Sequence, residues 1–188
     1  RGRPGMRGVF VHPFADPDVM AGNGTIALEL HEDLPDIDTI LVPWGGGGLA
    51  CGIAAAAKAI DPKVRVLACE VEGAAPLSAS FAAGAPVAIE NRKTFVDGIG
   101  GREVFSEMWP LAQTLDDALV ASLADVARAV RLLAQRARVV AEGAGATPLA
   151  IALGGLGVSP RPRRVACIVS GGNVDPSVLA AILAGTIP

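Results

Sequence analysis

Four consecutive glycines, Gly45–Gly48, stand between a short apolar run and an alanine-rich stretch. The run at 39–43 predicts a buried strand, and the stretch at 47–60 predicts a helix. Glycine loses more backbone entropy on folding than other residues, so four in succession need a structural reason. A glycine turn that ends a strand and opens a helix leaves backbone N–H groups unpaired at the positive end of the helix dipole. Such a turn predicts a binding site for an anion, most often a phosphate.

The rest of the chain alternates β-branched runs with helical patterns, which is typical of βαβ units on a parallel sheet. The sequence therefore predicts an α/β fold with an open parallel sheet and helices on both faces. Residues 84–117 show no clean period, and we expect them to pack around a site or to cross the sheet. The expected strands are 8–11, 39–43, 64–70, 118–121 and 164–169, and the expected helices are 24–33, 47–60, 75–83, 123–138, 144–153 and 176–184.

Composition excludes several classes of function. The net charge is -3 and both signs are interspersed, so the chain has no basic stripe for nucleic acid or an anionic membrane. No apolar run reaches the roughly 18 to 20 residues of a membrane span, and the start of the chain lacks the apolar core of a signal peptide. The well-separated Cys51, Cys69 and Cys167 favour free thiols over a metal site or disulfides. We expect a soluble, cytoplasmic protein.

Two kinds of phosphate ligand fit the glycine turn. Gly45–Ala50 satisfies G-x-G-x-x-A, and Glu70 lies where a dinucleotide fold keeps the acid that binds ribose, which would indicate an NAD-dependent oxidoreductase. A second glycine turn, Ser170–Asp175, follows the expected strand 164–169, and α/β proteins bind ligands at the carboxyl ends of strands. The two turns suggest one pocket. In it the Ser170 hydroxyl either hydrogen-bonds a heteroaromatic nitrogen or, equally well, helps to cap the final helix.

Five motifs occur in a fixed order: "HPFADPDVMAGNGTIALEL", "VPWGGGGLACGIA", "VDGIG", "VVAEGAGA" and "IVSGGNVD". In this order they resemble the threonine and serine dehydratases and serine racemase, pyridoxal-phosphate enzymes of the tryptophan synthase β fold type. The resemblance runs from about Val9 to about Leu183 and covers the carboxyl-terminal part of such an enzyme. It favours pyridoxal 5'-phosphate over a dinucleotide as the ligand.

The resemblance also implies roles for particular residues. Ser170 would hydrogen-bond the pyridine nitrogen, and this neutral hydroxyl makes the ring a milder electron sink than an aspartate would, which suits β-elimination. Gly98 would lie beside the ring and Glu142 near it. Asn23 stands where the family carries a glutamine. The backbone N–H groups that would hold the cofactor's 5'-phosphate belong to Gly45, Gly46, Gly47, Gly48 and Leu49.

The family's cation site is incomplete in this sequence. Serine racemase relatives bind a divalent cation through a glutamate, a backbone carbonyl and an aspartate. Glu70 and Ala74 match the first two, but Pro76 replaces the aspartate. Losing one of two carboxylate ligands weakens the binding of a hard cation, so we expect no metal.

The catalytic lysine of the family is not found in this sequence. In the family it precedes the "HPF" motif, binds the cofactor covalently and removes the α-proton. Lys58, Lys63 and Lys93 all read as solvated surface residues. We therefore expect an irregular basic segment at 1–8, followed at 9–188 by the carboxyl-terminal part of the large cofactor-binding domain, without the small domain and the lysine segment.

The resemblance thus implies the cofactor-binding portion of an ammonia-lyase that converts serine or threonine into a 2-oxo acid and ammonia. Alone, this portion is expected to be inactive, and the full-length enzyme is expected to be a homo-oligomer. Two alternatives stay open, namely the NAD-dependent oxidoreductase and a non-catalytic remnant of the pyridoxal-phosphate fold.

Overall fold

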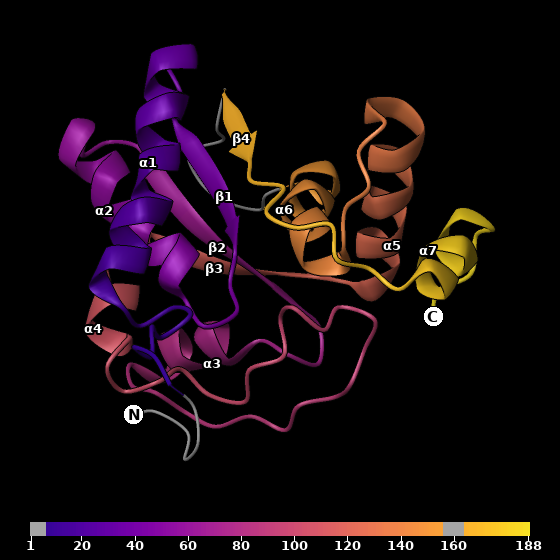
Figure 1. Ribbon diagram of the computed structural model, residues 1–188, viewed down its shortest axis with the longest axis horizontal. Helices are drawn as coiled ribbons and strands as arrows, with labels where there is room; N and C mark the ends of the chain where they lie inside the picture. The colour runs from indigo at the N-terminus through magenta and orange to yellow at the C-terminus, as the bar shows by residue number, and fades with distance from the viewer. Residues whose placement is uncertain (1–6, 156–163) are drawn as a thin grey trace.

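A parallel sheet lies between two layers of helices in the computed structural model, which describes residues 7–155 and 164–188 (Figure 1). The strands are β1 (Thr39–Pro43), β2 (Arg65–Val71), β3 (Asp117–Ala121) and β4 (Val165–Cys167), in the order β3-β2-β1-β4 with every pair parallel. The helices are α1 (Pro17–Asp33), α2 (Gly48–Ile60), α3 (Pro76–Ala83), α4 (Trp109–Ala112), α5 (Leu123–Leu132), α6 (Gly143–Gly154) and α7 (Pro176–Leu183), and a π-helical turn, η1, covers Leu133–Ala137. The predicted α/β class is confirmed.

The central strand β1 is buried on both faces. Ile40 and Val42 pack into a core shared with α1 and α2, whereas Leu41 packs into a second core shared with α5 and α6. Successive side chains of a strand point to opposite faces, so one apolar run supplies both cores. This arrangement explains why β1 reads as a continuous apolar segment.

The strand order reverses beside β1. The chain leaves β1 through α2 and enters β2 on one side, whereas β4, the last strand in the described chain, pairs with the other side of β1. Parallel α/β sheets bind ligands outside the carboxyl ends of the strands at such a switch point. The two glycine turns follow β1 and β4, so the topology places both of them there.

Helices α1 and α2 approach each other through glycines. A Cβ added to Gly24 would lie 3.0 Å from the carbonyl oxygen of Gly52, and a Cβ added to Gly52 would overlap the carbonyl oxygen of Met20. The two backbones are therefore in direct contact, and α1 fixes the position of the first turns of α2.

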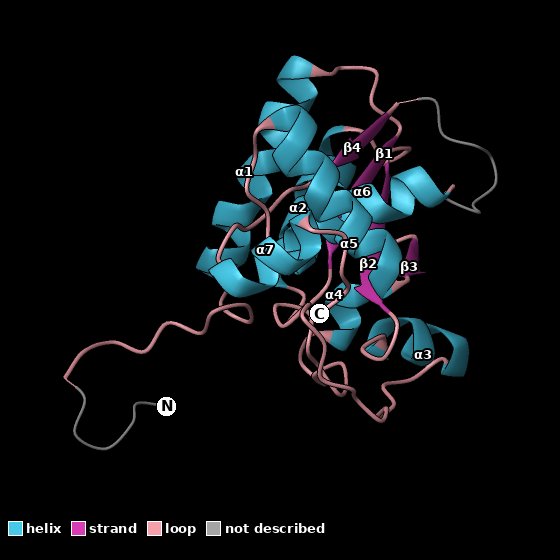
Figure 2. Ribbon diagram, turned by 90° about the vertical axis from the view of Figure 1, so that its right-hand side faces the viewer, coloured by secondary structure: helices cyan, strands magenta, loops and turns pink. Residues whose placement is uncertain are grey.

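Some predicted elements differ from the structure. The strand predicted at 8–11 is wrong. These residues form a loop instead, and no strand of the described chain pairs with them (Figure 2). Val9 is accordingly 93% exposed. Helix α1 begins at Pro17 instead of residue 24, because Asp16 caps it by accepting a hydrogen bond from the Asp18 N–H and proline suits the first helical position. Most of the irregular segment predicted at 1–8 lies outside the described residues.

The remaining differences lie in the second half of the chain. The helix predicted at 123–138 ends as an α-helix at Leu132 and continues as η1. Arg138 then takes a left-handed conformation, with a φ of 60°, which stops the helix. Helix α4 forms inside the segment 84–117, where no helix was predicted. None of the described helices is both long and apolar enough to cross a membrane.

Candidate functional site

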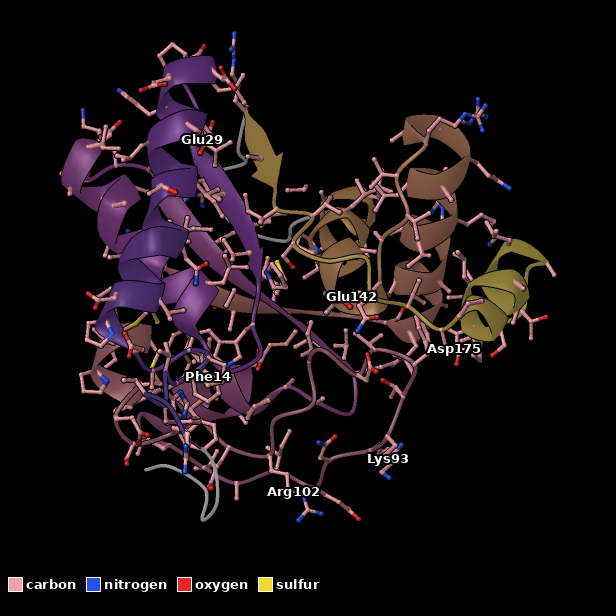
Figure 3. All side chains as sticks on the ribbon, in the orientation of Figure 1. Phe14, Glu29, Lys93, Arg102, Glu142 and Asp175 are labelled. Atoms are coloured by element: carbon pink, nitrogen blue, oxygen red, sulfur yellow. The ribbon has the colours of Figure 1, made fainter. Side chains whose placement is uncertain are left out.

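One pocket, of about 270 Å³, lies at the switch point beside the ends of β1 and β4. Figure 3 shows the two sides of this region, with Phe14 from the loop before α1 and Glu142 from the start of α6. The seven residues predicted as the cofactor site, Gly45–Gly48, Leu49, Gly98 and Ser170, all line the pocket. Glu142 lines it as well, with Pro13, Phe14, Asn23, Pro43, Ile99 and Ala144. The fold thus brings together five segments that lie far apart in the sequence.

The first glycine turn leaves the N-terminus of α2 without a side-chain cap. Helix α2 begins at Gly48, and its N-cap Gly47 has a left-handed φ of 92°. No acidic residue occupies the first turn of the helix. The first N–H groups of a helix have no partner within the helix, so these amides can receive hydrogen bonds from an anion.

Close packing beneath the turn requires glycine. A Cβ on Gly46 would overlap the Phe14 ring, and a Cβ on Gly48 would overlap the Phe14 backbone. A Cβ on Gly47 would lie 2.5 Å from the Trp44 ring, and its positive φ already disfavours other residues. Neighbouring groups therefore hold the turn in its conformation. An uncapped helix N-terminus on a rigid glycine turn suits a phosphate group, so these residues fit the phosphate of a cofactor.

The second glycine turn packs against α6. The Glu142 N–H donates a hydrogen bond to the Gly171 carbonyl oxygen at 3.0 Å, and a Cβ on Gly145 would lie 2.7 Å from the same oxygen. Of the two roles left open for Ser170, helix capping falls to Asp175, whose carboxylate accepts a hydrogen bond from the Ser177 N–H at 2.7 Å. The Ser170 hydroxyl makes no hydrogen bond with the described parts of the chain and borders the pocket.

Glu142 gives the pocket an acidic end. Burial raises the pKa of the Glu142 carboxyl, the nearby carboxylate of Asp97 raises it further, and the backbone N–H of Asn173 lowers it. Burial and a neighbouring negative charge both favour the neutral acid. Glu142 therefore keeps its proton to a higher pH than an ordinary glutamate does, on the side of the pocket that Ser170 also lines.

Glu70 does not serve the pocket. It is fully buried, and its two carboxylate oxygens accept hydrogen bonds from the Leu77 and Ser78 N–H groups at 2.8 Å each. The carboxylate thus satisfies the first amides of α3. Because both oxygens are engaged inside the protein, Glu70 is not available for the ribose of a dinucleotide. Among the described residues, no cluster of three or more His, Cys, Asp or Glu side chains could hold a metal ion.

The lysines lie outside the pocket. Lys58 forms an ion pair with Asp116 at 2.8 Å and also bonds the Val64 carbonyl oxygen. Neither Lys63 nor Lys93 lines the pocket. Lys63 and Lys93 are exposed, as predicted from the sequence, whereas Lys58 is half-buried.

Sequence reasoning missed Phe14. Its ring lies 4.4 Å from that of His12 and 5.2 Å from that of Phe105, measured between ring centroids. The His12 Nδ1 in turn accepts a hydrogen bond from the Ala15 N–H at 3.0 Å. These contacts hold Phe14 against the glycine turn. Only its place in the "HPF" motif could have drawn attention to it, because no spacing rule predicts a contact with residues about thirty positions away.

Comparisons with known proteins agree with this geometry. Residues 4–171 match the family described as "Pyridoxal-phosphate dependent enzyme". The chain is 40% identical over 176 residues to L-threonine ammonia-lyase of Thermotoga maritima, covering 93% of this chain and 43% of that protein. It is 39% identical over 177 residues to serine racemase of Oryza sativa subsp. indica, covering 91% of this chain and 52% of that protein.

Solved structures show the same likeness. Maize serine racemase superposes with a TM-score of 0.85 at 36% identity, over 94% of this chain and 55% of that one. The processed form of threonine deaminase isoform 2 from Solanum lycopersicum superposes with a TM-score of 0.82 at 30% identity, over 93% of this chain and 52% of that one. The chain spans about half the length of the relatives it matches. The uncapped glycine turn at a switch point and these similarities lead to one conclusion: this chain belongs to the family of pyridoxal-phosphate-dependent enzymes.

Proposed function

We propose that this chain is the cofactor-binding portion of a threonine/serine dehydratase-like ammonia-lyase. One observation supports the proposal most strongly. Residues of both glycine turns line a single pocket at the switch point, together with Gly98 and Glu142. The whole enzyme would remove water from a β-hydroxy amino acid, serine or threonine, and release a 2-oxo acid and ammonia. Residues 9–188 would form the carboxyl-terminal part of its large domain.

In this proposal each group of residues has a separate task. The backbone N–H groups of Gly45–Gly48 and Leu49 bind the cofactor's phosphate, and Ser170 hydrogen-bonds the pyridine nitrogen. Gly98 lies beside the ring, at a position where packing also disfavours a side chain, since an added Cβ would lie 2.8 Å from the Ala144 Cβ. When bound, the cofactor supplies an electron sink for the substrate's α-carbon. Because no lysine is among the described residues that line the pocket, the proposal for this chain is limited to binding and orienting the cofactor.

The proposal also includes the cellular location and the oligomeric state of the enzyme. Cys51, Cys69 and Cys167 are free thiols in the structure, which fits a reducing cytoplasm. Burial raises the pKa of Cys51 to about 12 and that of Cys167 to about 11, so both thiols stay protonated at neutral pH. We also propose a homo-oligomeric full-length enzyme.

A ligand titration tests the proposal. Trp44 is 2% exposed and lies directly beneath Gly47, so its fluorescence reports on the glycine turn. Pyridoxal 5'-phosphate is expected to change the fluorescence of the chain saturably, whereas NADH is expected to leave it unchanged. Saturable binding of NADH without a response to pyridoxal 5'-phosphate would instead favour the oxidoreductase alternative.

A further inference from the structure

The pocket has no positive side chain for a phosphate. Of the described residues that line it, none is a lysine, an arginine or a histidine, and the one ionisable side chain is the acid Glu142. A phosphate group in this pocket must therefore be held by neutral donors. Hydrogen bonds from neutral donors to an ionised group are stronger than bonds between two neutral groups, so a few well-placed N–H groups suffice.

One side chain in the lining offers such donors beside the glycine turn. Asn23 lies on α1 and lines the pocket. It stands next to the second turn of α2, because a Cβ added to Gly52 would come within 3.3 Å of the Asn23 Cβ. The backbone contact between α1 and α2 fixes this position.

The Asn23 amide is free to serve a ligand. It makes no hydrogen bond to any part of the chain that the structure describes, whereas nearby Thr25 donates its hydroxyl proton to the Gly22 carbonyl oxygen at 2.8 Å. An asparagine amide carries two N–H donors, and an aspartate of the same shape carries none when ionised. The residue is thus a neutral donor in the lining of the pocket, next to the helix that the glycine turn opens.

We propose that the Asn23 side-chain amide donates a hydrogen bond to the phosphate of the cofactor and so supplements the backbone N–H groups of the glycine turn. This inference rests on the proposed function, because it assumes that the turn binds a phosphate. It assigns α1 a part in ligand binding besides its packing against α2.

The test compares two ligands that differ only in the phosphate. Pyridoxamine 5'-phosphate and pyridoxamine both lack the aldehyde that would react with surface lysines, and the affinity of the 188-residue chain for each is measured by calorimetry. The variants are Asn23→Ala and the isosteric Asn23→Asp. The matched control is Glu29→Gln, an acid-to-amide change at an exposed position of the same helix, which Figure 3 shows far from Phe14.

The inference predicts a phosphate-specific loss. Asn23→Ala should weaken pyridoxamine 5'-phosphate about tenfold, Asn23→Asp should weaken it more by adding a negative charge, and both should leave pyridoxamine within about twofold. Glu29→Gln should leave both affinities unchanged. Thermal unfolding shows whether each variant remains folded, and the isosteric Asn23→Asp keeps the test valid if the alanine variant does not.

The possible results distinguish a failure of the role proposed for Asn23 from a failure of the proposed function. If the unmodified chain prefers pyridoxamine 5'-phosphate and the folded Asn23 variants keep that full preference, the role of Asn23 is overturned while the phosphate site stands. Equal losses for both ligands would also overturn it, because Asn23 would then contact the ring. If the unmodified chain shows no preference for the phosphorylated ligand, the proposed function itself fails.

Discussion

Two glycine turns follow neighbouring strands of one sheet, yet only one of them leaves a helix uncapped. After β1, α2 starts behind Gly47 with no side-chain cap. After β4, Asp175 caps α7 through the Ser177 N–H. Amides that a side chain has already satisfied have less to offer an anion than amides that are left unpaired. Under the proposed function, the first turn therefore offers unpaired backbone amides to the phosphate, whereas the second offers the Ser170 side chain and leaves the start of its helix capped.

The turns also differ in what surrounds them. A Cβ on Gly48 would overlap the backbone of Phe14, and a backbone cannot easily move aside. A Cβ on Gly171 would overlap the end of the Glu142 side chain, which can rotate away. A side chain should therefore be tolerated less well at Gly48 than at Gly171.

The largest effect is expected from Gly48→Ala. The added methyl group must displace the Phe14 backbone, and overpacking of this kind costs about 2–3 kcal/mol of unfolding free energy. The displacement also disturbs the helix N-terminus, so the affinity for pyridoxamine 5'-phosphate should fall at least tenfold. Urea unfolding and calorimetric titration measure the two effects. A variant with the stability and affinity of the parent would show that the packing at Gly48 is not restrictive.

A smaller effect is expected from Asp175→Ala. Removing the cap of α7 should lower the Tm by about 2–4 °C and leave ligand affinity unchanged, because the cap belongs to the second turn. Asp175→Asn, which keeps a capping oxygen, should retain most of the Tm. A loss of ligand affinity in Asp175→Ala would contradict the division of roles between the turns.

The Asp175 cap also predicts a pH dependence. Hydrogen bonds from the Ser177 hydroxyl and N–H lower the pKa of Asp175 below its ordinary value of 3.8. A carboxylate with a lowered pKa stabilises the fold above its unfolded pKa, and this contribution disappears as the pH falls through the folded pKa. The Tm difference between the parent and Asp175→Ala should therefore vanish in acid. A constant difference down to about pH 2 would argue against an ionised cap.

A milder effect is expected from Gly171→Ala. The Glu142 carboxylate can move away from the new methyl group, so the loss of unfolding free energy should stay below about 1 kcal/mol. The preference for pyridoxamine 5'-phosphate over pyridoxamine should persist, because we propose that the phosphate binds at the other turn. A cost in stability equal to that of Gly48→Ala would remove the contrast between Gly48 and Gly171.

The smallest effect is expected from Asp97→Asn. Burial is the main reason for the raised pKa of Glu142, and the charge of Asp97 is the second. Removing that charge should lower the pKa of Glu142 part of the way toward its ordinary value. Carbon-detected NMR of the side-chain carboxyl groups follows this titration directly. An unchanged pKa would mean that Asp97 does not act on the acidic end of the pocket.

Local sequence patterns predicted much of this fold. The bounds predicted for β1, 39–43, are those observed, because a strand buried on both faces reads as a continuous apolar run. The sequence also predicted both glycine turns. Their position in one pocket follows from the rule that parallel strands present their carboxyl ends at one edge of the sheet.

The remaining features depend on contacts between distant segments. The run at 8–11 has the pattern of a strand but finds no strand to pair with in the described chain. Glu70 resembles a ribose-binding acid in sequence, and only the three-dimensional structure shows that α3 engages both of its oxygens. Phe14 reaches the glycine turn across the fold in the same way. Pairing partners and burial are tertiary properties, so spacing along the chain does not predict them.

The central claim is that the backbone amides of the first glycine turn bind a phosphate. Amide NMR of the ¹⁵N-labelled chain during titration with pyridoxamine 5'-phosphate tests it most directly. The account predicts the largest shift changes at the amides of Gly45–Leu49, smaller changes at Ser170 and Gly98, and little change at the capped start of α7. Saturable binding that leaves the amides of Gly45–Leu49 unshifted would contradict it.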